Sequence, residues 1–293
     1  AEMARHNVAY RIPTPMYGAG LIEQIPDSAI LANQASDPVR KRALGIRGRA
    51  NFQRADNTIS GQSNHNGNDG TIARFGWKAQ NKSLLLFAGE AYNVEMGISN
   101  ELFQNERDET PSCQFAGTPN DFSHSDAATP FEAISDIEKF ALFGRFLAPP
   151  VPSEDTPGGA ASIANGRNLF SDVGCALCHT PTYTTGNATV AALRNQPVNL
   201  YSDLLVHDMG PGLADGVSQG QAGPGEFRSA PLWGLGQRVY FLHDGRTSDL
   251  MEAIQDHRSG SGKTFFEGIG VHDNFNHPAE VQKQDILIFV RSR

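Results

Sequence analysis

The chain has 293 residues, a length that favours two domains and allows a core without disulfides. Its 24 basic and 32 acidic residues give a formal net charge of −8. This charge argues against a nucleic-acid-binding protein, because such proteins present a basic face. The longest apolar runs, at 84–88 and 286–290, are far shorter than the about 18 residues of a transmembrane helix, so we expect no transmembrane segment.

Glycine and proline, with 30 and 17 residues, predict short elements separated by long irregular loops. Apolar residues at spacings of three and four predict a mainly α fold. The expected helices are, in chain order, Ser28–Gln34 with Asp27 as N-cap, Lys82–Ala91, Phe131–Leu147, Ala161–Phe170, residues 247–257 with Thr247 or Ser248 as cap, and Glu280–Arg291.

Three polar segments separate the expected helices of the first half. Residues 37–50 are interpreted as a solvated face, with the basic residues Arg40, Lys41, Arg42, Arg47 and Arg49. Residues 51–71 are rich in Asn, Gly and Asp and predict a long loop. Such oxygen-rich loops can bind calcium, although this one lacks the spaced carboxylates of an EF-hand, so calcium stays an alternative to a plain loop. Residues 105–130 predict another polar loop, which carries Cys113.

A linker divides the chain near its middle. The run from Ala148 to Gly159 contains four prolines and two glycines, a composition typical of linkers. We therefore predict an N-terminal domain at 1–147, a linker at 148–160 and a C-terminal domain at 161–293.

The motif Cys175-Ala-Leu-Cys178-His179 has the C-x-x-C-H spacing of c-type haem attachment. Two thiols at this spacing can reach the two vinyl groups of one haem, and the adjacent His179 can ligate the iron as the proximal ligand. A zinc site would need four ligands, and a thioredoxin-type site would need a βαβ context, so both are weaker interpretations. Covalent haem attachment implies maturation outside the cytoplasm, hence a periplasmic or extracellular location.

A six-coordinate haem needs a second axial ligand, normally His or Met. The downstream candidates are His207, Met209, His243, Met251, His257, His272 and His277. Met209 lies in a Gly/Pro-rich loop, which suits a thioether ligand, whereas His257 closes the expected helix 247–257, which would hold it rigidly. Spacing alone leaves the choice open.

The chain also resembles a known family over nearly its whole length. Segments starting at Ser229, Tyr240 and Leu250, and in the first half at Pro15, Gly76 and Val94, are similar in sequence and order to the di-haem oxidoreductase branch of the bacterial cytochrome c peroxidase superfamily. That superfamily includes the enzyme that matures the methylamine dehydrogenase cofactor. The resemblance implies cytochrome-c-type haem domains.

The resemblance also implies roles for particular residues. The helix after His-Asp-Gly-Arg supplies the sixth ligand in this family, which makes His257 the first choice and Met209 the second. His243 then resembles the motif histidine, near the haem. Glu95 matches a glutamate that stands over the open face of the other haem and moves protons. Trp77 and Trp233 are expected near or between haems, or in the core.

One difference from the family limits which of its properties can be expected of this chain. Family members have a first C-x-x-C-H upstream, and this chain has one such motif. The alternatives are a fragment of a longer precursor, one half of a split protein or a natural single-haem member. Two functions follow. In the first, the C-terminal haem relays electrons from a small redox protein to a second haem site that acts on peroxide. In the second, the chain is a pure electron-transfer cytochrome, or a cytochrome subunit of a larger assembly, without substrate chemistry.

Overall fold

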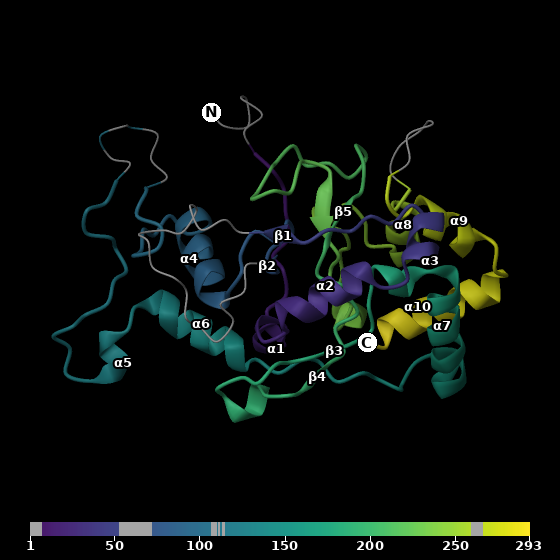
Figure 1. Ribbon diagram of the computed structural model, residues 1–293, viewed down its shortest axis with the longest axis horizontal. Coiled ribbons are helices and arrows are strands. Elements are labelled where there is room, and N and C mark those ends of the chain that lie inside the picture. The colour runs from purple at the N-terminus through teal and green to yellow at the C-terminus, as the bar shows by residue number, and fades with distance from the viewer. Residues whose placement is uncertain (1–7, 53–71, 107–109, 111, 113–114, 259–265) are drawn as a thin grey trace.

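The computed structural model describes residues 8–52, 72–106, 110, 112, 115–258 and 266–293. Helices joined by long irregular segments dominate this part of the chain (Figure 1), which confirms the predicted mainly α class. The α-helices are α1 (Ala19–Glu23), α2 (Asp27–Ala35), α3 (Pro38–Ala43), α4 (Leu84–Val94), α5 (Pro130–Ala133), α6 (Asp136–Phe146), α7 (Gly159–Val173), α8 (Leu250–Gln255), α9 (Ile269–Asn276) and α10 (Glu280–Arg291). None of these helices is long and apolar enough to cross a bilayer.

The strands of the described residues form three antiparallel pairs. The pairs are β1 (Asn51–Phe52) with β2 (Ile72–Ala73), β3 (Tyr183–Thr184) with β4 (Pro197–Val198), and β5 (Val206–Asp208) with β6 (Glu226–Arg228). In the β5–β6 pair, Val206 lies opposite Arg228 and His207 lies opposite Phe227. This pair therefore fixes the segment after the C-x-x-C-H motif beside the segment that precedes Trp233.

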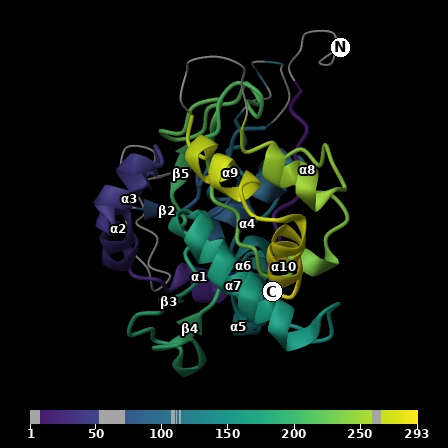
Figure 2. The same ribbon diagram turned by 90° about the vertical axis from the view of Figure 1, so that its right-hand side faces the viewer.

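The helices α7 and α10 cross in close contact at one end of the molecule (Figure 2). A Cβ at Gly166 would lie 2.0 Å from the carbonyl oxygen of Asp285, so only glycine permits this crossing. Phe170 of α7 packs edge-on against Phe289 of α10, with ring centroids 5.4 Å apart. The crossing anchors a core cluster that continues to α8 and α9.

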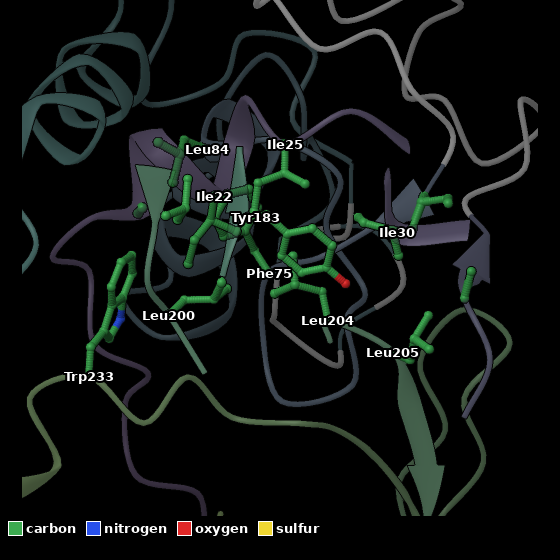
Figure 3. Close-up of a cluster of buried hydrophobic side chains, with 14 of the residues drawn as sticks. Ile22, Ile25, Ile30, Phe75, Leu84, Tyr183, Leu200, Leu204, Leu205 and Trp233 are labelled. Carbon is green, nitrogen blue, oxygen red and sulfur yellow. The ribbon is translucent and has the colours of Figure 1, made fainter. Parts of the chain in front are cut away.

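A second core cluster joins the two halves of the chain (Figure 3). It combines Ile22 and Ile25 from the first half with Tyr183, Leu200 and Trp233 from the second half. The predicted division at 148–160 stays a prediction, and the two segments share this core.

Two expected helix starts were wrong. Asp27 is the first residue of α2 rather than its N-cap, because its carboxylate pairs with Arg74 and accepts the N–H of Ile72. The helix expected at 247–257 is the shorter α8, and its N-cap is Asp249, whose carboxylate accepts the N–H of Met251. His257 consequently lies in the turn after α8.

The helix expected at Phe131–Leu147 is also wrong, because the chain breaks into α5 and α6. The backbone of Ile134 is extended at the break, and the N–H groups of Asp136 and Ile137 donate to the two carboxylate oxygens of Asp121 at 2.7 and 3.0 Å. Asp121 thus satisfies N–H groups that a continuous helix would have used internally.

The other expected helices exist with adjusted bounds. Ser83 caps α4 by accepting the N–H of Leu86, and α7 is longer than predicted at both ends. The terminal helix Glu280–Arg291 is confirmed as predicted. The helices α1, α3 and α9 were not predicted.

The basic segment 37–50 is more than a solvated face. Lys41 is buried, and its Nζ donates to the Asn33 carbonyl at the end of α2. Arg40 donates to the carbonyls of Ser171 and Asp172 at the end of α7. These cations satisfy carbonyl groups that helix ends leave free, so the segment ties two helices together. Residues 53–71, where calcium was an alternative, and Cys113 lie outside the described residues.

Candidate functional site

A large apolar pocket lies among α7, α8, α9 and α10, which are grouped at one end of the molecule (Figures 1 and 2), and β6 also contributes to its wall. Its empty space, including the open mouth, is about 1480 Å³. Much of its wall comes from the core residues Phe170, Leu235, Phe241, Leu250, Phe275 and Ile286. Of the residues predicted to hold or approach a haem, the structure brings Cys175, Cys178, His179, His257, Met209, Trp77 and His243 into this pocket.

The C-x-x-C-H motif follows directly from the end of α7. Gly174 ends that helix with φ +108°, and the short 3-10 helix η5 (Cys175–Leu177) follows. The N–H of His179 donates to the carbonyl of Cys175 at 2.8 Å. This tight turn points the motif into the pocket beside the apolar end of α7. Burial first, and Cys178 second, raise the pKa of the Cys175 thiol to about 12, so the thiol is neutral there.

The ring of His179 is arranged as a metal ligand would be. Its Nδ1 lies 3.0 Å from the carbonyl oxygen of Tyr201, and a carbonyl can only accept, so Nδ1–H is the donor. Nε2 therefore carries the free lone pair. Burial, and next the nearby His257, lower the pKa of His179 to about 4. A neutral imidazole with one oriented free nitrogen is the form that binds iron.

His257 repeats the same arrangement on another element. Its Nδ1 lies 2.9 Å from the carbonyl oxygen of Ala253, which makes Nε2 the free nitrogen. Burial lowers the pKa of His257 as well. His179 and His257 line the same pocket. The pocket thus contains two neutral histidines, each held through Nδ1 by a backbone carbonyl.

Met209, the second choice for the distal ligand, lies just after β5. It packs in a small cluster with Trp77, Leu213 and Phe227 and also lines the pocket. A position in the pocket therefore does not separate Met209 from His257. The difference between them is orientation, since His257 has a hydrogen bond that selects its free nitrogen.

The two tryptophans lie in different places. Trp77 lines the pocket, and its Nε1–H donates to the Ile12 carbonyl at 2.7 Å. His243 is buried, stacks on Phe227 with centroids 4.3 Å apart and meets Trp77 edge-on. Trp233 lies in the shared core instead (Figure 3) and does not line this pocket.

Glu95 lies outside the pocket. It is exposed and follows the last residue of α4, with its N–H donating to the Ala91 carbonyl. No pocket described in this structure is lined by Glu95. Glu95 is therefore exposed in this chain on its own, and its catalytic role stays a prediction.

His207 belongs to a buried network that the sequence reasoning missed. Its Nε2 lies 2.9 Å from Asp203 and its Nδ1 lies 2.7 Å from Glu267, so both ring nitrogens are used and His207 drops out as a distal ligand. Burial alone would lower the pKa of His207, but Cys178 and Asp203 outweigh burial and raise it well above its usual value. The one feature of the sequence that could have indicated this network is the i,i+4 spacing of Asp203 and His207.

His272, another distal candidate, also has both ring nitrogens engaged. Nε2 lies 2.6 Å from the amide oxygen of Gln255, and Nδ1 lies 3.1 Å from a carboxylate oxygen of Asp273. The remaining pocket chemistry fits a haem: an apolar cleft, two thiols at its edge and two imidazoles with free Nε2 atoms.

Comparison with known proteins agrees with this fit. The model of the family described as "Di-haem oxidoreductase, putative peroxidase" matches residues 4–282. The chain therefore belongs to this family and is a haem redox protein. A search of curated proteins found no match.

Two solved structures are similar at low identity. One is hydrazine synthase of Kuenenia stuttgartiensis under xenon pressure, at 13% identity and TM-score 0.39, covering 100% of this chain and 92% of the other. The other is a MauG-like protein associated with microbial copper homeostasis, at 15% identity and TM-score 0.36, covering 97% and 91%. At these TM-scores neither likeness supports an inference about function.

Proposed function

We propose that this chain is a c-type cytochrome unit of a peroxidase-type oxidoreductase and that it carries electrons to a second haem site. Cys175 and Cys178 would attach one haem by thioether bonds, and His179 would be the proximal ligand of its iron. Bound haem supplies one-electron chemistry between ferric and ferrous iron. The observation that carries the proposal is the pair His179 and His257, both neutral and both with Nε2 free in one pocket.

Ligation by two histidines would favour electron relay over substrate chemistry. If His179 and His257 both held the iron, they would leave no place on it for peroxide to bind. Bis-histidine ligation also favours ferric iron relative to His/Met ligation and so suits a low-potential electron carrier. Met209 remains the alternative ligand, with the same consequence for peroxide but a higher potential.

Substrate chemistry would then require a second haem, held by an upstream or partner segment. Glu95 would serve that haem as the proton-moving group, since a positioned carboxylate contributes about 10²–10⁴-fold to such a step. The alternative function is pure electron transfer without substrate chemistry. The exposed position of Glu95, away from every pocket described here, favours this alternative for the chain by itself.

Trp77 is the aromatic residue best suited to assist electron transfer, because it lines the pocket and a neighbouring smaller pocket as well. We infer that a small redox protein exchanges electrons with the haem through the pocket mouth. Covalent attachment through Cys175 and Cys178 supports a periplasmic or extracellular location for this exchange.

The test is a haem count per chain combined with spectra and turnover. The protein is produced with a c-type haem maturation system, and haem is quantified after denaturation together with the intact mass. We expect one covalent haem, a low-spin ferric spectrum and no peroxide turnover by the chain alone. A high-spin ferric haem that turns over peroxide would overturn the relay role, and the absence of covalent haem would overturn the proposal altogether.

A further inference from the structure

Two arginines line the apolar pocket without an acidic partner. Arg228 ends β6, and Arg238 follows the short 3-10 helix η7 (Leu235–Gln237). Neither forms an ion pair with any carboxylate of the described residues. Arg228 is buried and Arg238 is half-buried. A buried cation without a counter-charge is costly, so this pair in an apolar wall indicates a missing anion.

Arg228 has one short hydrogen bond. The residue is 7% exposed, and its Nε donates to the carbonyl of Gly76 at 2.9 Å. Nη1 has only a long contact, 3.5 Å, with the Ser229 carbonyl, and Nη2 has no hydrogen-bond partner among the described residues. Burial first, and the charge of Arg238 second, lower the pKa of Arg228 to about 10.

Arg238 supplies an independent observation. Its Nε is buried and has no hydrogen-bond partner. Arg228 and Arg238 both line the neighbouring smaller pocket as well, together with Trp77 and Pro231. The two arginines therefore stand in the wall between the two pockets, and the Nε of Arg238 has no hydrogen-bond partner there.

The acids nearest to this wall are already in use. Glu267 is the one carboxylate among the described residues lining the pocket, and it is engaged by His207 and by the N–H groups of Arg47 and Asp208. Asp203, which acts on Arg228 from a distance, is held by His207 and by the Ser229 hydroxyl. The missing anion must therefore come with a ligand.

We propose that Arg228 and Arg238 bind the two propionate carboxylates of the haem that Cys175 and Cys178 attach. This inference rests on the proposed function. A haem has its two carboxylates together on one edge, away from the vinyl groups that the thiols take, and guanidinium groups bind carboxylates through paired N–H donors. Arg228 and Arg238 would offset this negative charge beside the iron, which stabilises the ferrous state and raises the reduction potential.

The test compares Arg228→Gln and Arg238→Gln with Arg228→Lys, which keeps the charge, and with Arg194→Gln. Arg194 is exposed, bonds only the local carbonyls of Ala188 and Thr189 and does not line the pocket, so it is the matched control for charge. Covalent haem per chain, the reduction potential and the propionate-bending band in the resonance Raman spectrum are measured on each holoprotein.

We expect each Gln variant to keep its covalent haem, to shift the propionate band and to move the ferric–ferrous equilibrium about tenfold toward ferric, which is about 59 mV for one electron. Arg228→Lys should keep most of the potential, and Arg194→Gln should match the parent. Unchanged potential and band in both Gln variants, with haem attached, would overturn the propionate role and leave the proposed function intact.

A dissolved anion could pair with Arg228 and Arg238 in place of the propionates, and inorganic phosphate is the probe for this alternative. Phosphate titrated into the parent holoprotein should leave the potential unchanged at constant ionic strength. A phosphate-dependent potential that Arg238→Gln abolishes would overturn the propionate role in favour of an exchangeable anion. Loss of covalent haem in the parent protein itself would contradict the proposed function instead.

Discussion

The two ends of the molecule in Figure 1 differ in how far their apolar side chains are buried within the chain itself. At the end formed by α7 to α10, apolar walls and oriented histidines surround one deep pocket. At the other end, α4 and α6 pack together but leave Phe140 and Phe143 49% and 60% exposed. The comparison teaches that residues of this chain line the pocket proposed for the haem, whereas the chemistry proposed at Glu95 would need a further surface.

The contrast also holds for the buried histidines within the first end. His179 and His257 are each held by one backbone carbonyl, so burial dominates and lowers the pKa. His207 lies between Asp203 and Glu267, and its pKa is raised. The same type of side chain is thus neutral in one place, with one ring nitrogen free, and charged in the other, with both ring nitrogens engaged.

The largest expected effect comes from removing the attachment site. Cys178→Ala should abolish or nearly abolish covalent haem, because one of the two thioether bonds can no longer form. Haem staining after denaturing electrophoresis measures this directly. Cys113→Ala is the matched control, since Cys113 is outside the C-x-x-C-H motif and should keep full staining. Equal staining of the two variants would refute c-type attachment at this motif.

The next effect concerns the distal ligand in the same pocket. His257→Ala should convert the low-spin ferric haem to high-spin, whereas Met209→Leu should leave the spectrum unchanged. The ferric parent should also lack the weak methionine-to-iron charge-transfer band, and its potential should be low. If that band is present and Met209→Leu removes it, Met209 is the ligand and His257 is not.

Stability tests the charged network beside the pocket. His207→Gln removes the positive partner of two buried carboxylates and should destabilise the protein by roughly 3–5 kcal/mol. The pKa of His207 is raised in the folded state. The charged His207 therefore stabilises the fold fully at pH values below its pKa in the unfolded chain, about 6.5. This stabilisation is lost as the pH rises through the pKa of His207 in the folded protein.

Denaturant unfolding of the parent and His207→Gln chains before haem attachment, when Cys178 is still a free thiol, checks this at several pH values. The difference in free energy of unfolding should be largest near pH 6 and shrink toward alkaline pH. A difference that grows with rising pH would mean that His207 is neutral in the folded protein.

A smaller effect is expected at the opposite end. Asp121→Ala removes the acceptor for the N–H groups of Asp136 and Ile137 and should cost about 0.5–2 kcal/mol, the usual cost of losing a helix cap. The haem spectrum should stay unchanged, because α6 does not line the pocket. Lys139→Ala, which removes a surface ion pair with Asp136 on the same helix, should cost less than Asp121→Ala.

The smallest effect is expected for Glu95→Gln. In the isolated chain this exposed residue touches no pocket described here, so spectrum, potential and stability should match those of the parent. In an assembly that holds a second haem, the same variant should slow peroxide reduction at least tenfold. An unaltered peroxide rate in that assembly would remove Glu95 from the chemistry and favour pure electron transfer.

Much of the site was predictable because its chemistry is local in sequence. Cys175, Cys178 and His179 lie within one turn, so their spacing alone indicates haem attachment. The terminal helix was predicted with its observed bounds, since its apolar spacing is regular and its first turn is capped by the nearby Gln282.

Only the tertiary structure decided the features that depend on distant partners. Asp121 breaks the helix expected at Phe131–Leu147 from outside it, and Arg74 takes Asp27 away from the cap position. The Tyr201 carbonyl, 22 residues from His179, selects the free nitrogen of that ring, and Glu267, 60 residues from His207, engages the second nitrogen of His207 and removes it from the candidates. Capping, ion pairing and tautomer choice all follow from contacts that residue spacing does not encode, because the competing groups meet only when the chain folds.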